Sequence, residues 1–108
     1  MQIRTVHRTG VLVFHLEGDF TEADELVAQV APTLDSPGSR VVIDLKKVGM
    51  ITSTGLGALV RLAAQANMQR SKLALAEPSA FVSSVLTTSK LDKFFEVYST
   101  IEAALAKV

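Results

Sequence analysis

Residues 41–61 contain a change of apolar pattern that restricts the fold of the whole chain. The run Val41–Ile43 is β-branched, which is typical of a strand buried on both faces. After a short turn, a cluster of Ser, Thr and Gly opens directly into apolar residues at helical spacing. We therefore expect a helix from Thr54 to about Met68. A buried strand followed closely by a helix indicates an α/β domain.

The remaining apolar runs alternate between strand and helix patterns. A hairpin comes first, and helices and strands then follow in turn. This order predicts an α/β fold in which one mixed sheet of about five strands is covered by about four helices, in a single domain of residues 1–108. The expected elements around the central strand and helix are a hairpin of Ile3–His7 and Val11–Leu16, a helix capped by Thr21, a strand Lys72–Ala76, a helix capped by Ser79, a strand Phe95–Tyr98 and a helix capped by Ser99 or Thr100.

Composition narrows the function classes. The 108 residues carry 11 basic and 11 acidic side chains, so the net charge is zero, whereas nucleic-acid binders usually concentrate positive charge. There is no cysteine, which removes disulfides, thiolate nucleophiles and Cys-based metal sites. No apolar stretch approaches the ~20 residues needed to span a bilayer. We expect a cytoplasmic protein that binds no nucleic acid directly and does not insert into a membrane.

The Ser/Thr/Gly cluster places a hydroxyl at a helix N-terminus. Ser53 or Thr54 can cap the free N–H groups of the first turn. The same donors and the positive end of the helix dipole would stabilise a phosphate attached there. Two interpretations follow from the residues: an ordinary cap, since Ser and Thr are the usual capping residues, or a switch that tolerates both states.

Several segments, taken in order, resemble the STAS domain (sulphate transporter and anti-sigma factor antagonist), and in particular its free-standing bacterial anti-sigma factor antagonists. The family pattern is a strand ending in Asp-Leu, a turn, an apolar residue and Asp-Ser-Ser/Thr-Gly-Leu before a helix. The matching residues are Asp44-Leu45, Met50-Ile51, Thr52-Ser53-Thr54-Gly55-Leu56, Leu16–Phe20, Leu91–Val97 and Ser99–Leu105.

The resemblance implies a mechanism and a site. Ser53 would be the phosphoacceptor. The partner would be an anti-sigma factor that is also a serine-protein kinase, and a phosphatase is a further partner that the resemblance allows. The implied partner-binding residues are Gly18, Asp19, Phe20, Thr21, Thr52, Thr54, Gly55 and Leu56.

Two residues depart from the family pattern. Thr52 and Thr21 stand where the family usually has Asp, so the site lacks up to two negative charges and Asp19 is the nearest acidic candidate. Phe20, in the same loop, has two interpretations: an apolar contact for a partner, or a hydrophobic staple at the start of the first helix. The phenylalanines Phe81, Phe94 and Phe95 are expected mostly in the core.

Catalytic patterns are absent from the sequence. His7 and His15 have no carboxylate at a spacing that suggests a triad or a metal site, so we expect both to be structural or exposed. Gly55 and Gly57 lack the other residues of a nucleotide loop, and close packing of the helix against the sheet explains them better. We therefore expect no enzymatic activity, no metal and no cofactor.

Two functions remain. The first is an anti-sigma factor antagonist that binds an anti-sigma factor and is released when Ser53 is phosphorylated. The second is a regulatory subunit of an ATP-binding cassette transporter that is not phosphorylated, which the missing Asp residues make more credible. A third function, a small enzyme or nucleotide-binding domain, is disfavoured because the sequence has no nucleophile, base or phosphate loop in a catalytic arrangement.

Overall fold

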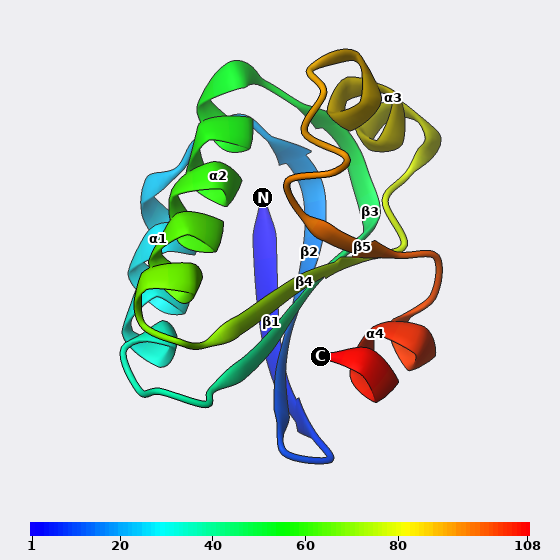
Figure 1. The fold of residues 1–108 in the computed structure, drawn as a ribbon. Helices are drawn as coiled ribbons and strands as arrows, with labels where there is room; N and C mark the ends of the chain where they lie inside the picture. The colour runs from blue at the N-terminus through cyan, green and yellow to red at the C-terminus, as the bar shows by residue number, and fades with distance from the viewer.

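A five-stranded sheet in the order β1-β2-β3-β4-β5 forms the centre of the molecule. The computed structural model describes residues 1–108 and confirms the predicted α/β class with its five strands and four helices (Figure 1). The elements are β1 Gln2–Arg8, β2 Val11–Phe20, α1 Asp24–Val30, a short 3-10 helix Ala31–Leu34, β3 Arg40–Ile51, α2 Ser53–Met68, β4 Lys72–Ala76, α3 Ala80–Thr88, β5 Glu96–Tyr98 and α4 Ile101–Lys107.

The sheet is mixed. β1 pairs antiparallel with β2, and all other neighbouring strands pair in parallel. The tight connection of the hairpin requires positive φ at Thr9 and Gly10, as the predicted hairpin turn would need. Parallel pairing brings the carboxyl ends of β2, β3 and β4 to one edge of the sheet, which is where open α/β sheets usually hold their functional loops.

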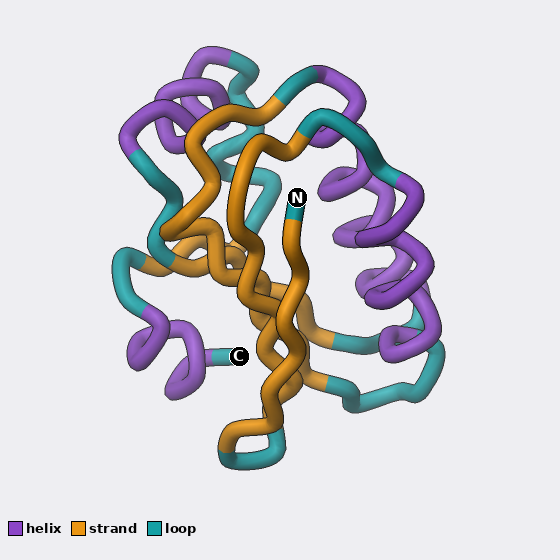
Figure 2. The backbone as a smooth tube through the Cα atoms, turned by 180° about the vertical axis from the view of Figure 1, so that it is seen from behind, coloured by secondary structure: helices purple, strands orange, loops and turns teal.

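Helices cover both faces of the sheet (Figures 1 and 2). α1 and α2 pack on one face, where Leu26 of α1 and Leu59 and Leu62 of α2 join a core cluster of 20 buried residues. α4 packs on the opposite face, where Ile101 and Ala104 join a smaller cluster of eight. α3 lies at the end of β3 and contributes Val82 and Leu86 to the larger cluster.

The central strand is much longer than the sequence pattern suggested. A turn was expected soon after Val41–Ile43, but β3 continues to Ile51. Lys46 and Lys47 are exposed on this extension, while Val48 is buried. The two lysines therefore belong to a strand and not to a turn. Two register shifts against β2 each insert one extra residue into β3, and such bulges bend a strand. The prediction of an early turn was therefore wrong.

A pair of polar side chains accompanies the first of these shifts. His15 and Asp44 are neighbours in the β2–β3 register, and His15 Nδ1 lies 2.7 Å from Asp44 Oδ2. The other oxygen of this buried carboxylate accepts a hydrogen bond from the Lys46 N–H at 2.9 Å. Asp44 therefore satisfies a backbone donor that the irregular pairing leaves free.

Two other local expectations are corrected. The first helix begins after Ala23, without a side-chain cap, so Thr21 does not cap it. Phe81 and Phe94 are 49% and 50% exposed, whereas Phe95 is buried as expected. The predicted cap at Ser79 is confirmed, because its hydroxyl accepts the Val82 N–H. Of the two alternatives for α4, Thr100 is the cap, and its hydroxyl accepts the Ala103 N–H.

Gly55 lets the start of α2 approach the end of β2. A Cβ added at Gly55 would lie 2.5 Å from the Phe20 carbonyl oxygen and 3.0 Å from two atoms of the Phe20 ring. Phe20 is completely buried beneath this contact. The predicted packing role is therefore confirmed for Gly55. It is wrong for Gly57, which is exposed and has no atom within 4 Å of an added Cβ.

We predict opposite effects of alanine at these two glycines. Gly55→Ala should destabilise the protein by about 1–3 kcal/mol, because backbone and core atoms must move to admit the methyl group. Gly57→Ala is the matched control and should stabilise it by about 0.5–1 kcal/mol, since alanine is the better helix former. Urea denaturation measures both. Equal stability of the two variants would show that α2 does not depend on this close contact.

Candidate functional site

The candidate site lies where β2 and β3 end and α2 begins, at the upper edge of the sheet in Figure 1. Phe20 and Ile51 are register partners at the ends of the two strands. The Thr52 N–H then donates to the Phe20 carbonyl oxygen at 3.1 Å. The Thr52 hydroxyl lies 3.4 Å from the carbonyl oxygens of both Phe20 and Thr21. These bonds bring together the two segments on which the predicted site depends, Gly18–Thr21 and Thr52–Leu56.

Thr52, and neither Ser53 nor Thr54, caps α2. It has extended backbone dihedrals, and its side chain accepts a hydrogen bond from the Gly55 N–H at 3.3 Å. Ser53 and Thr54 are the first two residues of the helix, and both are exposed. The expectation that Ser53 or Thr54 would be the cap is therefore wrong. The capping bond does not involve the Ser53 hydroxyl, so a change at Ser53 leaves it intact.

Backbone donors at the start of α2 are only partly used. The Leu56 N–H donates to the Thr52 carbonyl oxygen at 2.8 Å, and Gly55 donates to the Thr52 side chain. The N–H groups of Ser53 and Thr54 precede the first intrahelical bond and have no acceptor within the helix. The first turn carries no acidic residue. An exposed hydroxyl thus sits beside two available donors at the positive end of the helix, an arrangement that favours an anionic group.

The structure explains how the site functions without one of the two family carboxylates, the one at position 52. Because position 52 is the cap of α2, the usual Asp would cap the helix with a charge, and Thr52 makes the same bond without one. Thr21 is exposed in the neighbouring loop. Asp19 is also exposed, and its Oδ1 would lie 3.6 Å from a Cβ on Gly49. The acidic side chains of this loop are therefore Asp19, beside Gly49 of β3, and Glu22, which is exposed next to Thr21.

The predicted partner-binding residues fall into three groups by exposure. Asp19, Thr21 and Thr54 are exposed, so their side chains are accessible to another molecule. Gly18 and Leu56 are half-buried, as is Thr52. Phe20 and Gly55 are buried against one another, so Phe20 is not an accessible contact. Ala23 is the N-cap of α1, so Phe20 does not stand directly before the cap, where a hydrophobic staple would be. Phe20 and Gly55 shape the site from beneath, and its surface comes from the other residues.

Sequence reasoning missed one exposed apolar residue at this edge. Met50, two residues before Thr52, is 39% exposed, while Ile51 next to it is buried. Strict alternation along the strand would have placed Met50 on the same face as the buried Val48, and the second register shift against β2 breaks that alternation, so the sequence carried no signal for its exposure. Met50 is therefore a further candidate for contact with a partner.

The histidines take no part in this site. His7 is exposed, and His15 is hydrogen-bonded to Asp44 within the sheet. Both agree with the expectation that the histidines are structural or exposed. Spacing could not reveal the pairing because the two residues are 29 positions apart and meet only through strand register.

No group of three or more His, Asp or Glu side chains gathers where a metal ion could bind. None of the helices combines the length and apolar character required to cross a membrane.

Comparison with known proteins gives a consistent result. The chain matches the STAS domain family over residues 2–104. BtrV of Bordetella bronchiseptica, named as a candidate anti-sigma factor antagonist, is 32% identical over 99 residues, which cover 90% of this chain and 85% of BtrV.

Solved structures show the same fold. A candidate anti-sigma factor antagonist from Thermotoga maritima aligns with a TM-score of 0.87 at 21% identity, covering 98% of this chain and 93% of that one. The anti-sigma factor antagonist SpoIIAA in its unphosphorylated form aligns with a TM-score of 0.78 at 16% identity, covering 98% and 95%. The phosphorylated form of SpoIIAA from Bacillus aligns with a TM-score of 0.73 at 15% identity, covering 98% of each chain. The match to the family over nearly the whole sequence, together with the identity to BtrV, shows that this chain belongs to the STAS domain family.

Proposed function

We propose that this protein is an anti-sigma factor antagonist whose binding is switched by phosphorylation of Ser53. In the unmodified state it binds an anti-sigma factor that is also a serine kinase, and the modification releases it. The observation that carries the proposal is the position of Ser53: exposed, first in α2, and outside the capping bond that Thr52 makes. The relatives named as anti-sigma factor antagonists supply the class of partner.

The chemistry of the helix end explains why the fold would tolerate the phosphate. A phosphoserine carries roughly −1.5 to −2 charges at neutral pH. The Ser53 and Thr54 N–H groups and the helix dipole can accept this charge, and no acidic side chain in the first turn opposes it. Phosphorylation of Ser53 therefore alters the surface while the packing of Gly55 on Phe20 stays in place.

The same charge would weaken a complex. A partner seated on the exposed residues Asp19, Thr21 and Thr54 would cover Ser53 and exclude water from it. Burying an unpaired phosphate against an apolar or acidic partner surface is costly. Binding and phosphorylation would thus compete for one surface, which is what a release mechanism requires.

The protein acts in this proposal by binding and not by catalysis. The kinase supplies ATP and magnesium, and a phosphatase restores the unmodified serine. SpoIIAA has been solved in both phosphorylated and unphosphorylated forms, which supports two such states for a protein of this fold. The proposed partner controls sigma factors, so the proposed site of action is the cytoplasm.

We predict that Ser53, and neither Thr52 nor Thr54, accepts the phosphate. Thr52 is half-buried and bonded to the Gly55 N–H, whereas Ser53 is exposed. Incubation with the co-purifying anti-sigma kinase and ATP, followed by peptide mapping, should locate the modification on Ser53. Undiminished labelling of Ser53→Ala, or labelling of Thr54 alone, would contradict this assignment.

We also predict that Ser53→Asp weakens partner binding much more than folding. A carboxylate in the first turn of a helix is favourable, so stability should change by no more than about 1 kcal/mol. Affinity for the anti-sigma factor should fall more than tenfold, equivalent to about 1.4 kcal/mol. Calorimetric titration measures the affinity, and thermal unfolding measures the stability.

Ser84→Asp provides the control, because it introduces the same charge at an exposed residue of α3. It should bind as wild type does. Equal loss of affinity in both variants would mean that net charge, and not position 53, governs binding. Unfolding of Ser53→Asp alone would show that Ser53 is structural.

A further inference from the structure

A second candidate interaction surface lies at the opposite end of α2 from Ser53. A hollow of about 790 Å³ opens between the last turns of α2, the start of β4 and the residues before β5. Apolar side chains of Leu73, Phe94 and Phe95 line it together with alanines of α2. The other lining residues are Asn67, Met68, Arg70, Ser71, Lys72 and Glu96. A hollow of this size is comparable to pockets that hold small ligands or peptide side chains.

Large apolar groups are unusually accessible around this hollow. Met68 is 82% exposed and Phe94 is 50% exposed. The Phe94 N–H donates to the Leu91 carbonyl oxygen at 2.9 Å, and its ring packs edge-on against Phe95 with 5.2 Å between the centroids. Phe94 is therefore held in an ordered turn. An ordered, half-exposed aromatic ring beside a flexible methionine is typical of a binding surface.

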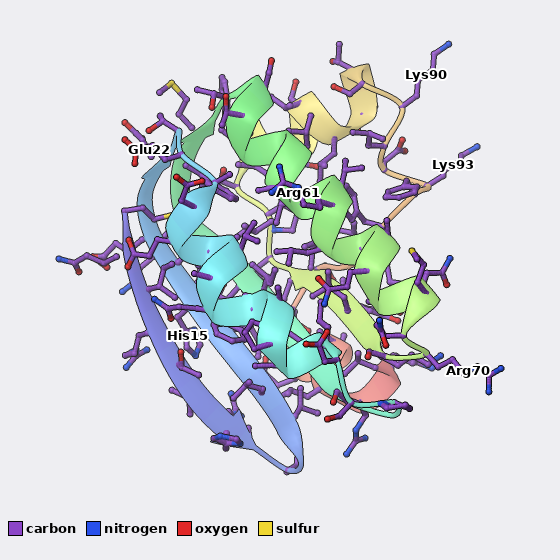
Figure 3. The ribbon with its side chains drawn as sticks, turned by 90° about the vertical axis from the view of Figure 1, so that its left-hand side faces the viewer. His15, Glu22, Arg61, Arg70, Lys90 and Lys93 are labelled. Carbon is purple, nitrogen blue, oxygen red and sulfur yellow. The ribbon has the colours of Figure 1, made fainter.

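Most of the charged side chains around the hollow are cations, and these cations have no ion-pair partner. Arg70 and Lys72 line it, and Lys93 directly precedes Phe94 (Figure 3). The ion pairs of the molecule are His15–Asp44, Lys46–Glu77 and Lys47–Glu17, so none involves these three cations. Glu96 is the one acidic residue in the lining, and the exposed Asp92 precedes Lys93, so three cations face two carboxylates. The surface thus combines an apolar centre with a cationic rim and is complementary to an acidic, apolar ligand.

We propose that this hollow binds a short acidic segment of a protein partner. An aromatic or aliphatic side chain of the segment enters between Phe94 and Met68, and flanking carboxylates pair with Arg70, Lys72 and Lys93. The concave shape favours an inserted side chain over a flat lipid surface. The residues of α2 that line the hollow, from Ala63 to Met68, lie about 15–22 Å along the helix axis from Ser53. A partner can bind here whether or not Ser53 is modified, so this inference does not rest on the proposed function.

A display library of random 12-residue peptides, panned on the immobilised full chain, tests this proposal. The selected peptides should be rich in Asp or Glu around an aromatic or aliphatic residue. Phe94→Ala should weaken their binding at least tenfold, and so should the double variant Arg70→Glu/Lys72→Glu. Thermal unfolding of each variant checks that it remains folded.

Matched controls come from the chain itself. Phe81→Ala removes another half-exposed phenylalanine, on α3, and Arg4→Glu reverses an exposed cation on β1. Ser53→Asp probes the other end of α2. All three should bind the selected peptides as wild type does.

Several outcomes would overturn the proposal: no enrichment, enrichment of basic peptides, or acidic peptides that bind Phe94→Ala normally. Sedimentation with phosphatidylglycerol vesicles that depends on Phe94, without peptide enrichment, would assign the hollow to a membrane surface instead.

Discussion

The carbonyl group of Phe20 fixes the start of α2, and the rest of the site depends on it. Its oxygen accepts the Thr52 N–H at 3.1 Å and lies so close to Gly55 that a Cβ there would be 2.5 Å away. The Phe20 ring fills the core below, completely buried. Helix, strand end and core are thereby joined at one point. Any residue larger than glycine at position 55 would push the helix away from the sheet and displace Ser53.

Capping and modification are assigned to different residues in this arrangement. Thr52 satisfies the Gly55 N–H without carrying a charge, and Ser53 is left exposed as the first residue of the helix. A phosphate on Thr52 would be repelled, because this residue is half-buried and its hydroxyl lies 3.4 Å from the carbonyl oxygens of Phe20 and Thr21. On the neighbouring residue it meets free backbone donors instead. The site can therefore change its charge while the helix that presents it keeps its cap.

Sequence patterns predicted the fold well where periodicity was strong. The β-branched run Val41–Ile43 and the apolar repeat of α2 located a central strand and helix, and the order of elements predicted the mixed sheet. The end of β3 was missed because a turn was expected soon after Ile43, whereas Lys46 and Lys47 are exposed residues of a strand with two register shifts against β2. Local charge cannot distinguish these cases.

Features that depend on tertiary contacts could not be predicted. Choosing Thr52 over Ser53 as the cap needs the backbone position that the Phe20 carbonyl oxygen sets. The His15–Asp44 pair exists only through strand register. Exposure of Phe94 depends on where the loop before β5 lies, and aromatic character alone favours the core. The two predicted site segments, Gly18–Thr21 and Thr52–Leu56, do lie side by side in the structure. The accessibility of their side chains depends on packing and could not be predicted from the sequence.

The central claim is that phosphorylation of Ser53 changes the surface and leaves the fold intact. Two-dimensional ¹H–¹⁵N NMR spectra of the unmodified and phosphorylated chain, recorded with amide hydrogen exchange, test it most directly. Large shifts should be confined to Thr52–Leu56 and Gly18–Thr21, with the amides of Ser53 and Thr54 most affected, and protection in β2, β3 and α2 should be unchanged. Shifts spread across the sheet, or faster exchange throughout α2, would contradict the account.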